Sequence, residues 1–318
     1  MTLDLSVLAT APRLLFDVAV KPIQGHRFQP TGFPDLGAAT YQAGSTDCLL
    51  VESAQSMANR LEATIWDAGS NTLIPAAKGL SYVQVNGKEG AFLTASILEA
   101  HRLNSVYVEK SNDGAFHKSL AKACNYSEKD PVDRPAFIKA MFRHDVNSLL
   151  HGTFLESIGG RLRLARALSS FIEAEGITVA ASGGVKNDHV MPGKEDGKEA
   201  KDGYGNVPFH REEYTASAIT ASFNLDLQQI RSYGLGDAAT RLLTILALYK
   251  IRALLDGNLR LRTACDLEVT SDVITARKPT GFVLPTLAVL EAELKLAITA
   301  NAAALGGEHA MTSVTVAK

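Results

Sequence analysis

Residues 13–23 read RLLFDVAVKPI, a stretch rich in β-branched residues in which apolar and polar side chains alternate. A period of two residues is typical of a strand with one face toward the core. Residues 217–227, SAITASFNLDL, alternate in the same way. The two stretches therefore predict strands of a sheet that lies at the centre of the fold.

Several other segments carry apolar side chains at helical spacing. In residues 53–66, Met57, Leu61 and Ile65 lie on one stripe, and Ser53 is placed to cap the first turn. Further helices are predicted at residues 92–101, 135–144, 238–255 and 287–298, with a short one that ends near residue 175. Further strands are predicted at residues 105–109, 149–155, 160–166, 177–181 and 259–269, and the tail after residue 306 is predicted to fray. This order predicts an α+β fold with long excursions between its elements.

The composition is that of a globular protein. The chain has 318 residues, of which 46% are hydrophobic and 21% are charged, which excludes a wholly disordered, collagenous or coiled-coil chain. The formal net charge is −2. A charge so close to zero does not decide whether the protein binds nucleic acid, because a local basic track can lie on a neutral molecule.

The three cysteines, Cys48, Cys124 and Cys265, are far apart and predict neither a disulfide framework nor a zinc knuckle. The N-terminal residues lack the basic start and apolar core of a secretory signal. The most apolar stretch carries Lys250 and Arg252, so it is a poor candidate for a membrane span. These features predict a cytoplasmic protein with no membrane partner.

Motifs of the common enzyme classes are scarce. The one match is GLGDAA at residues 234–239, which lies between a strand-like and a helical segment and fits the GxGxxA pattern of dinucleotide-binding turns. A nucleotide-binding enzyme that uses this turn is therefore an alternative hypothesis. A tight turn with Asp237 as a helix cap explains the same residues.

The arginines are more informative. Arg161 and Arg163 alternate with leucines, as do Arg260 and Arg262, which places each pair on one side of a strand. Two such strands could form a basic face that binds a phosphate backbone. The alternative is a protein whose arginines only form structural salt bridges.

Residues 183–210 are rich in glycine and charged side chains and cannot bury enough apolar surface to fold alone. The apolar tip Val190-Met191-Pro192 suits insertion between stacked bases, whereas the alternative is a disordered surface loop.

Longer strings identify a family resemblance. They lie at residues 27–37 (RFQPTGFPDLG), 50–62 (LVESAQSMANRLE), 161–168 (RLRLARAL), 204–209 (YGNVPF), 223–227 (FNLDL) and 259–267 (LRLRTACDL). In this order they resemble the Cascade backbone subunit of type I-G (formerly I-U) CRISPR systems. The resemblance implies one domain of the RAMP superfamily over residues 1–318. Its RRM-like (ferredoxin-like) palm would carry a finger-like insertion within residues 24–130 and a thumb hairpin at residues 183–210.

The same resemblance implies a function without catalysis and without a cofactor. Several copies of the subunit would form a helical filament along the spacer of a CRISPR RNA and present the guide for pairing with target DNA in antiviral defence. The other partners would be the large subunit, the guide-processing subunit and a helicase-nuclease. Some relatives in type III systems cleave RNA with an acidic loop residue, so an RNA-cleaving RAMP protein that uses Asp35 is a further alternative.

Residue patterns and resemblance together predict the RNA contacts, with no catalytic residue and no metal site. The predicted contacts are Lys21, Gln24, His26, Arg27, Gln29, Ser56, Asn59, Arg60, Arg161, Arg163, Arg166, Lys186, Val190, Met191, Arg260 and Arg262.

Overall fold

A computed structural model describes residues 3–33, 35–186, 207–257 and 259–316. Its main sheet is antiparallel, with the strand order β16-β17-β1-β15-β12-β5-β4. These strands are β1 (Arg13–Pro22), β4 (Thr40–Ala43), β5 (Thr46–Glu52), β12 (Leu168–Glu175), β15 (Ala218–Asp226), β16 (Leu259–Arg262) and β17 (Cys265–Val269). Leu14 pairs with Leu225 and Phe16 with Phe223, so the alternating apolar residues of both strands share one buried face.

Helices cover that buried face. Helix α1 (Ala54–Ala63) contacts β12 and α7 (Asp237–Asp256), and α7 also contacts β17 and α8 (Leu287–Ala300). Helix α1 lies in the connection from β1 to β12, and α7 lies in the connection from β15 to β17. No helix among the described residues is long and apolar enough to cross a membrane.

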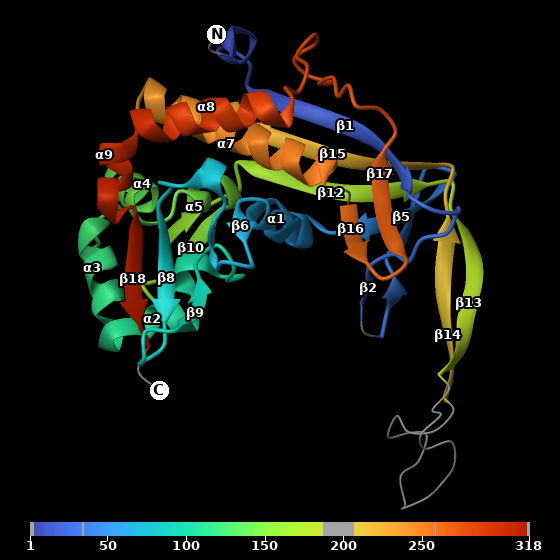
Figure 1. The fold of residues 1–318 in the computed structure, drawn as a ribbon, viewed down its shortest axis with the longest axis horizontal. Helices are drawn as coiled ribbons and strands as arrows, with labels where there is room; N and C mark the ends of the chain where they lie inside the picture. Colours follow the sequence, from blue (N-terminus) through green and yellow to red (C-terminus); the bar gives the residue numbers. More distant parts are fainter. Residues whose placement is uncertain (1–2, 34, 187–206, 258, 317–318) are drawn as a thin grey trace, which may run out of the picture.

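A second lobe lies at one end of the main sheet, on the left in Figure 1. Its sheet has the order β18-β8-β9, and β18 runs parallel to β8 although the two are far apart in the sequence. The lobe contains β8 (Tyr82–Asn86), β9 (Phe92–Ala95), β18 (Met311–Thr315), α2 (Val106–Glu109), α3 (Ala115–Ala123), α4 (Arg134–His144), α5 (Asn147–His151) and α9 (Ala302–Leu305).

Short elements connect these parts. They are the pairs β2 (Gly32–Phe33) with β3 (Gly37–Ala38), β6 (Trp66–Asp67) with β7 (Thr72–Leu73) and β10 (Thr153–Leu155) with β11 (Leu162–Leu164), helix α6 (Leu227–Ser232), and the 3-10 turns Ser6–Leu8, Pro75–Ala77, Arg102–Asn104, Ser111–Gly114 and Gly307–His309.

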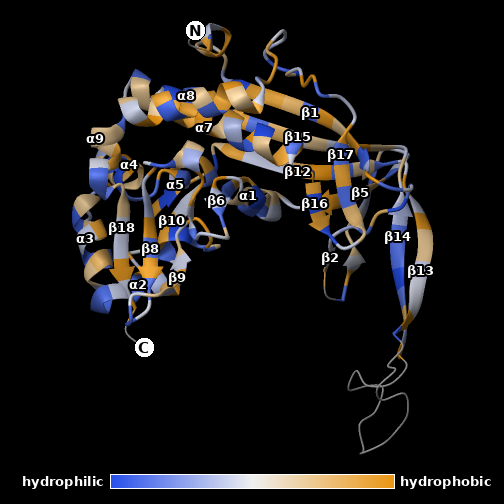
Figure 2. Ribbon diagram, viewed as in Figure 1, coloured by the Kyte–Doolittle hydropathy of each residue, from blue (hydrophilic) through white to orange (hydrophobic). Residues whose placement is uncertain are grey.

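A two-stranded hairpin stem, β13 (Thr178–Lys186) and β14 (Val207–Thr215), extends from the other end of the main sheet to the same side as the second lobe (Figure 1). Strand β14 is mainly hydrophilic (Figure 2). The thumb predicted at residues 183–210 overlaps the outer part of this stem. The predicted contacts Val190 and Met191 fall outside the described residues.

The predicted finger-like insertion, residues 24–130, divides between two parts of the structure. Strand β5 and helix α1 fall within this range but belong to the main sheet and its helical layer. The later part of the range, including β8 and β9, contributes to the second lobe.

The most regular patterns are confirmed. The strand at residues 13–23 is β1, and the strand at 217–227 is β15. The Ser53 hydroxyl accepts a hydrogen bond from the Ser56 N–H and caps α1 as predicted. The helices predicted at 135–144, 238–255 and 287–298 are α4, α7 and α8, so the α+β class is confirmed.

Several weaker patterns gave wrong predictions of secondary structure. The helix predicted to end near residue 175 is strand β12, LSSFIEAE, in the middle of the main sheet. Its serine, glutamate and alanine residues do not favour a strand by themselves, but pairing on both sides and burial of Leu168, Ser170, Ile172 and Ala174 override that preference. The single strand predicted at 259–269 is the hairpin β16–β17, which turns at Ala264 with a φ of 58°.

The second lobe holds the other errors. Residues 92–101 begin with strand β9 instead of a helix, and residues 105–109 form helix α2, capped by Ser105, instead of a strand. Residues 149–155 complete α5 before they enter β10. The tail after residue 306 is not frayed, because its strand β18 pairs with β8 and buries Val314.

The buried tail gives a direct prediction. Val314 is 2% exposed, so Val314→Asp places a carboxylate in the core of the second lobe and should lower the free energy of unfolding by at least about 2 kcal/mol. Thr315→Asp is the matched control, because Thr315 on the same strand is exposed. Chemical denaturation measures both variants. Equal stability of the two would mean that the tail does not pack as described.

Candidate nucleic-acid interface

The strand pair β10–β11 carries two outward side chains, Arg163, which was predicted as an RNA contact, and Phe154, which was not. Leu162 and Leu164 of β11 are buried, so Arg163 between them faces outward, as the alternation predicted. Phe154 of β10 lies directly opposite Arg163 in the register and is 45% exposed. An arginine and an aromatic ring therefore lie side by side on one outward face.

One cleft beside this pair has a volume of about 720 Å³. Phe154, Arg163 and Arg166 line it, together with His101, Arg102, His151, Thr153 and the carboxylate-bearing Glu156. The Arg166 guanidinium donates to Oε1 of Gln55 on α1, which connects the cleft to the exposed face of that helix. Burial and the neighbouring Arg102 lower the pKa of Arg166, which as an arginine still remains charged at neutral pH.

A second cleft of about 420 Å³ shares Arg163 with the first. Its other arginines are Arg13 of β1 and Arg134, the first residue of α4. Arg13 forms an ion pair of 3.0 Å with Asp226. Arg134 and Arg163 are both exposed and, within the described part of the chain, neither forms an ion pair or a side-chain hydrogen bond.

Three guanidinium groups around β11, those of Arg134, Arg163 and Arg166, thus have no carboxylate partner among the described residues. Like charges that are brought together without counter-ions attract anions, and planar guanidinium forks match the oxygens of a phosphate. We name these three residues the arginine cluster.

The floor of the larger cleft is fixed by a buried polar network. Arg102 donates to both oxygens of Glu62, at 2.7 and 2.5 Å. Lys250 is fully buried and contacts Oδ1 of Asn147 at 2.5 Å and Nε2 of His151 at 2.8 Å. Burial lowers the pKa of Lys250 to about 7. These contacts hold Arg102 and His151 in the wall of the cleft.

Arg60 and Arg262 were predicted as RNA contacts, and the structure places both at a buried carboxylate. Glu52 is 2% exposed and pairs with Arg60 at 3.4 Å and with the guanidinium of Arg262. Arg262 also donates to the carbonyl of Gln29, and Arg60 to the carbonyls of Arg260 and Leu261. These two arginines therefore connect β5, α1 and β16.

The expected basic face of four arginines is not assembled. Arg260 lies on the outward face of the main sheet, with its side chain 85% exposed and 3.7 Å from Asp266. Arg161 donates to the carbonyls of Ser127 and Asp130 and lies over the ring of Tyr126. Of the two Arg-x-Arg motifs, Arg163 alone joins the arginine cluster.

The loop after β1 is fixed at both sides. Phe28 exchanges backbone hydrogen bonds with Tyr214, and the Gln29 N–H donates to the carbonyl of Ala264. Arg27 pairs with Glu213 at 3.4 Å, and Lys21 with Glu268 at 3.3 Å. The remaining predicted contacts in this loop, Gln24 and His26, are exposed.

Other predicted contacts lie on α1 and on the hairpin stem. Asn59 is exposed, and its Oδ1 accepts from Gln55, the residue that also binds Arg166. Ser56 is half-buried near the start of the same helix. Lys186 ends β13, far along the stem. The α1 residues thus adjoin the arginine cluster, whereas Lys186 belongs to a separate surface.

Sequence reasoning missed Arg13, Arg134 and Phe154. Arg13 and Arg134 are single arginines in unlike surroundings, and only the fold brings them to β11. Phe154 carried a weak signal, because it alternates with Thr153 and Leu155 in a segment predicted as a strand.

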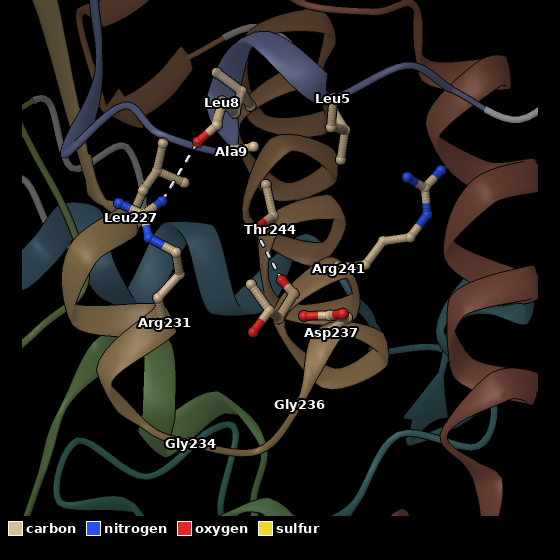
Figure 3. A pocket seen from close by; sticks show the side chains of 11 residues that line it. Leu5, Leu8, Ala9, Leu227, Arg231, Gly234, Gly236, Asp237, Arg241 and Thr244 are labelled. Atoms are coloured by element: carbon tan, nitrogen blue, oxygen red, sulfur yellow. Dashed lines mark hydrogen bonds between the residues drawn. The ribbon is translucent and has the colours of Figure 1, made fainter.

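The alternative site at residues 234–239 lacks the context that a dinucleotide-binding turn requires. Helix α6, not a strand, comes before it, and the nearby sheet is antiparallel. A pocket of about 620 Å³ does lie at this end of α7. Figure 3 shows Asp237 beside Gly236 there, and the Arg231 guanidinium turned toward the Leu8 carbonyl, to which it donates. A carboxylate in the first turn of α7 disfavours a phosphate at that position.

Asp35, the residue of the RNA-cleaving alternative, is exposed between β2 and β3. Among the residues with described positions, no cluster of three or more histidine, cysteine or acidic side chains could hold a metal ion.

Comparisons with known proteins give one family. No curated protein matches the chain. Among solved structures, a chain described as "CRISPR RNA-guided surveillance complex, pre-nicking" is similar at 14% sequence identity with a TM-score of 0.42, over 83% of this chain and 77% of that chain. The model of the family "CRISPR-associated protein GSU0053" matches residues 14–179, more than half of the chain. This range includes β1 from its second residue on, α1 and the strand pair β10–β11, and the protein belongs to this CRISPR-associated family.

Proposed function

We propose that this protein is a non-enzymatic, cytoplasmic CRISPR RNA-binding subunit that forms the backbone of a type I Cascade complex, of subtype I-G. The observation that carries the proposal is the arginine cluster: Arg134, Arg163 and Arg166 surround β11 without a carboxylate partner among the described residues. In a member of a CRISPR-associated family, the backbone of a guide RNA is the anion that best fits such a surface.

The order of the central strands supports an RRM-like palm. Strands β17, β1, β15 and β12 are neighbours in that order, with α1 and α7 in the two crossover connections. This is the β-α-β-β-α-β arrangement of ferredoxin-like folds. The palm would be extended by β16 at one edge and by β5 and β4 at the other.

The projecting parts fit the remaining roles. The β13–β14 stem is the proposed thumb, and the second lobe with the β2–β3 turn is the proposed finger region. Both extend to the same side of the main sheet (Figure 1), so an RNA on that side could contact both. Further copies would continue the filament, and the guide's own bases would select the target DNA. The large subunit, the guide-processing subunit and a helicase-nuclease would complete the machinery.

A matched pair of arginine variants tests RNA binding. Arg163→Ala should weaken binding of unrelated single-stranded RNAs by a similar factor and make the log–log salt slope shallower by roughly 0.7, because one phosphate contact is lost. Its melting temperature should change little, since Arg163 is exposed and unpaired within the described chain. Fluorescence anisotropy at several salt concentrations measures the slope.

Arg262→Ala is the control. It removes a charged hydrogen bond from buried Glu52, so it should lower the free energy of unfolding by roughly 1.5–3 kcal/mol and leave the salt slope unchanged. An unchanged slope in Arg163→Ala, or a shallower slope in Arg262→Ala, would reverse the assignment of these two arginines.

The proposal also predicts the absence of nuclease activity. The purified protein should leave single-stranded RNA and DNA intact in Mg²⁺ or Mn²⁺, as gel electrophoresis of labelled strands would show. Metal-dependent cleavage that is lost in Asp35→Ala would instead establish the RNA-cleaving alternative.

A further inference from the structure

We propose, resting on the function proposed above, that the outward face of β10–β11 binds one nucleotide unit of single-stranded RNA. The base stacks on Phe154, and the adjoining phosphate lies between Arg163 and Arg134.

The ring of Phe154 is accessible from the larger cleft. Its neighbours Thr153 and Leu155 are buried, whereas the ring of Phe154 is 45% exposed and lines the 720 Å³ cleft. Within the described chain it takes part in no ring–ring pair and no cation–π contact. The ring face is therefore open to a ligand, and a nucleobase offers a flat π surface of matching chemistry.

The side chains beside that ring are positively charged. Arg163 is the direct cross-strand partner of Phe154 and lines both clefts, so a phosphate bound there is next to the ring. Arg134 lines the second cleft from the first position of α4. A cation at a helix N-terminus is unfavourable because the macrodipole is positive there. A phosphate between the two guanidinium groups offsets the unfavourable position of Arg134 at the helix N-terminus and the repulsion between the two arginines.

The acids around the clefts do not cancel this charge. Asp226 in the second cleft is paired with Arg13, and Glu62 below the first is paired with Arg102. Among the described residues, Glu156 is the one carboxylate residue that lines the first cleft, which Arg163 and Arg166 also line. The cationic groups therefore outnumber the available carboxylates on the surface that Phe154 shares.

The cleft also offers polar partners beside the ring. His151 Nδ1 and Thr153 Oγ1 are buried and have no hydrogen-bond partner among the residues that the structure describes, and both residues line the 720 Å³ cleft. The two residues are thus suited to the ribose or to a base edge, whereas an apolar peptide would leave them unpaired.

The test compares the full chain and its variants in binding two labelled 12-nucleotide probes, oligo-uridine and an abasic strand of the same length. Phe154→Leu should weaken oligo-uridine binding about 5- to 100-fold with an unchanged salt slope, because stacking of a base is lost and phosphate contacts remain. Phe154→Tyr should bind like the wild type. Arg134→Gln should make the slope shallower by roughly 0.7. The abasic strand should bind wild type and Phe154→Leu equally.

Phe171→Leu is the matched control, because Phe171 is 38% exposed on the outward face of β12 and lines neither cleft. Melting temperatures show whether each variant is folded. If Phe154→Leu does not fold, the binding of oligo-uridine by Phe154→Tyr still tests the stacking site. If the wild type binds oligo-uridine and Arg163→Ala weakens it, but Phe154→Leu behaves like Phe171→Leu, the stacking site is wrong and the RNA-binding function stands. If the wild type binds neither probe, both are wrong.

Discussion

Glu52 is at the end of β5, 2% exposed, and a carboxylate so far from water is stable only when cations are bound to it. Arg60 and Arg262 supply them, and in doing so they connect helix α1 to the edge hairpin of the main sheet. Glu62 imposes the same requirement on Arg102 at the base of the larger cleft. Buried carboxylates thus hold Arg60, Arg102 and Arg262 within the fold. Arg134, Arg163 and Arg166 differ from them, because they have no carboxylate partner among the described residues.

This difference explains why the site could be predicted only in part. Alternation with leucines correctly placed Arg163 on an outward face, because periodicity is a local property. The same alternation gave Arg262 the same prediction, yet its partner Glu52 is 210 positions away in the sequence. Nothing local distinguishes an arginine that meets a buried acid from one that does not. Arg134 was missed for the same reason, since only the fold brings the first residue of α4 to the cleft that β11 lines.

The fold shows a similar limit. Strands β1 and β15 and helices α1 and α8 have periodic apolar residues, α7 is a long apolar segment, and all five were predicted from the sequence. Strand β12 was predicted as a helix, because LSSFIEAE owes its conformation to the strands on both of its sides and not to its own residues. The predicted division into palm, fingers and thumb came from the resemblance to the Cascade backbone family, because the spacing of apolar residues does not predict such a division. Of these three parts, the palm has the most direct support, because β17, β1, β15 and β12 are neighbours in the sheet and α1 and α7 lie in the crossover connections.

The distribution of charge is as informative as the location of the cluster. A net charge of −2 over 318 residues means that the molecule as a whole does not attract a polyanion. On the outward face of the main sheet, Arg13, Lys21 and Arg260 are each paired with an acid, and such exposed pairs add little to binding or stability. The arginine cluster, which has no carboxylate partner among the described residues, lies instead around β11, near the connection from the second lobe into the main sheet. This arrangement suits the filament proposed above. Neutral flanks would let neighbouring copies approach without repulsion, while the arginine cluster would hold the backbone of the guide at a fixed position in each copy.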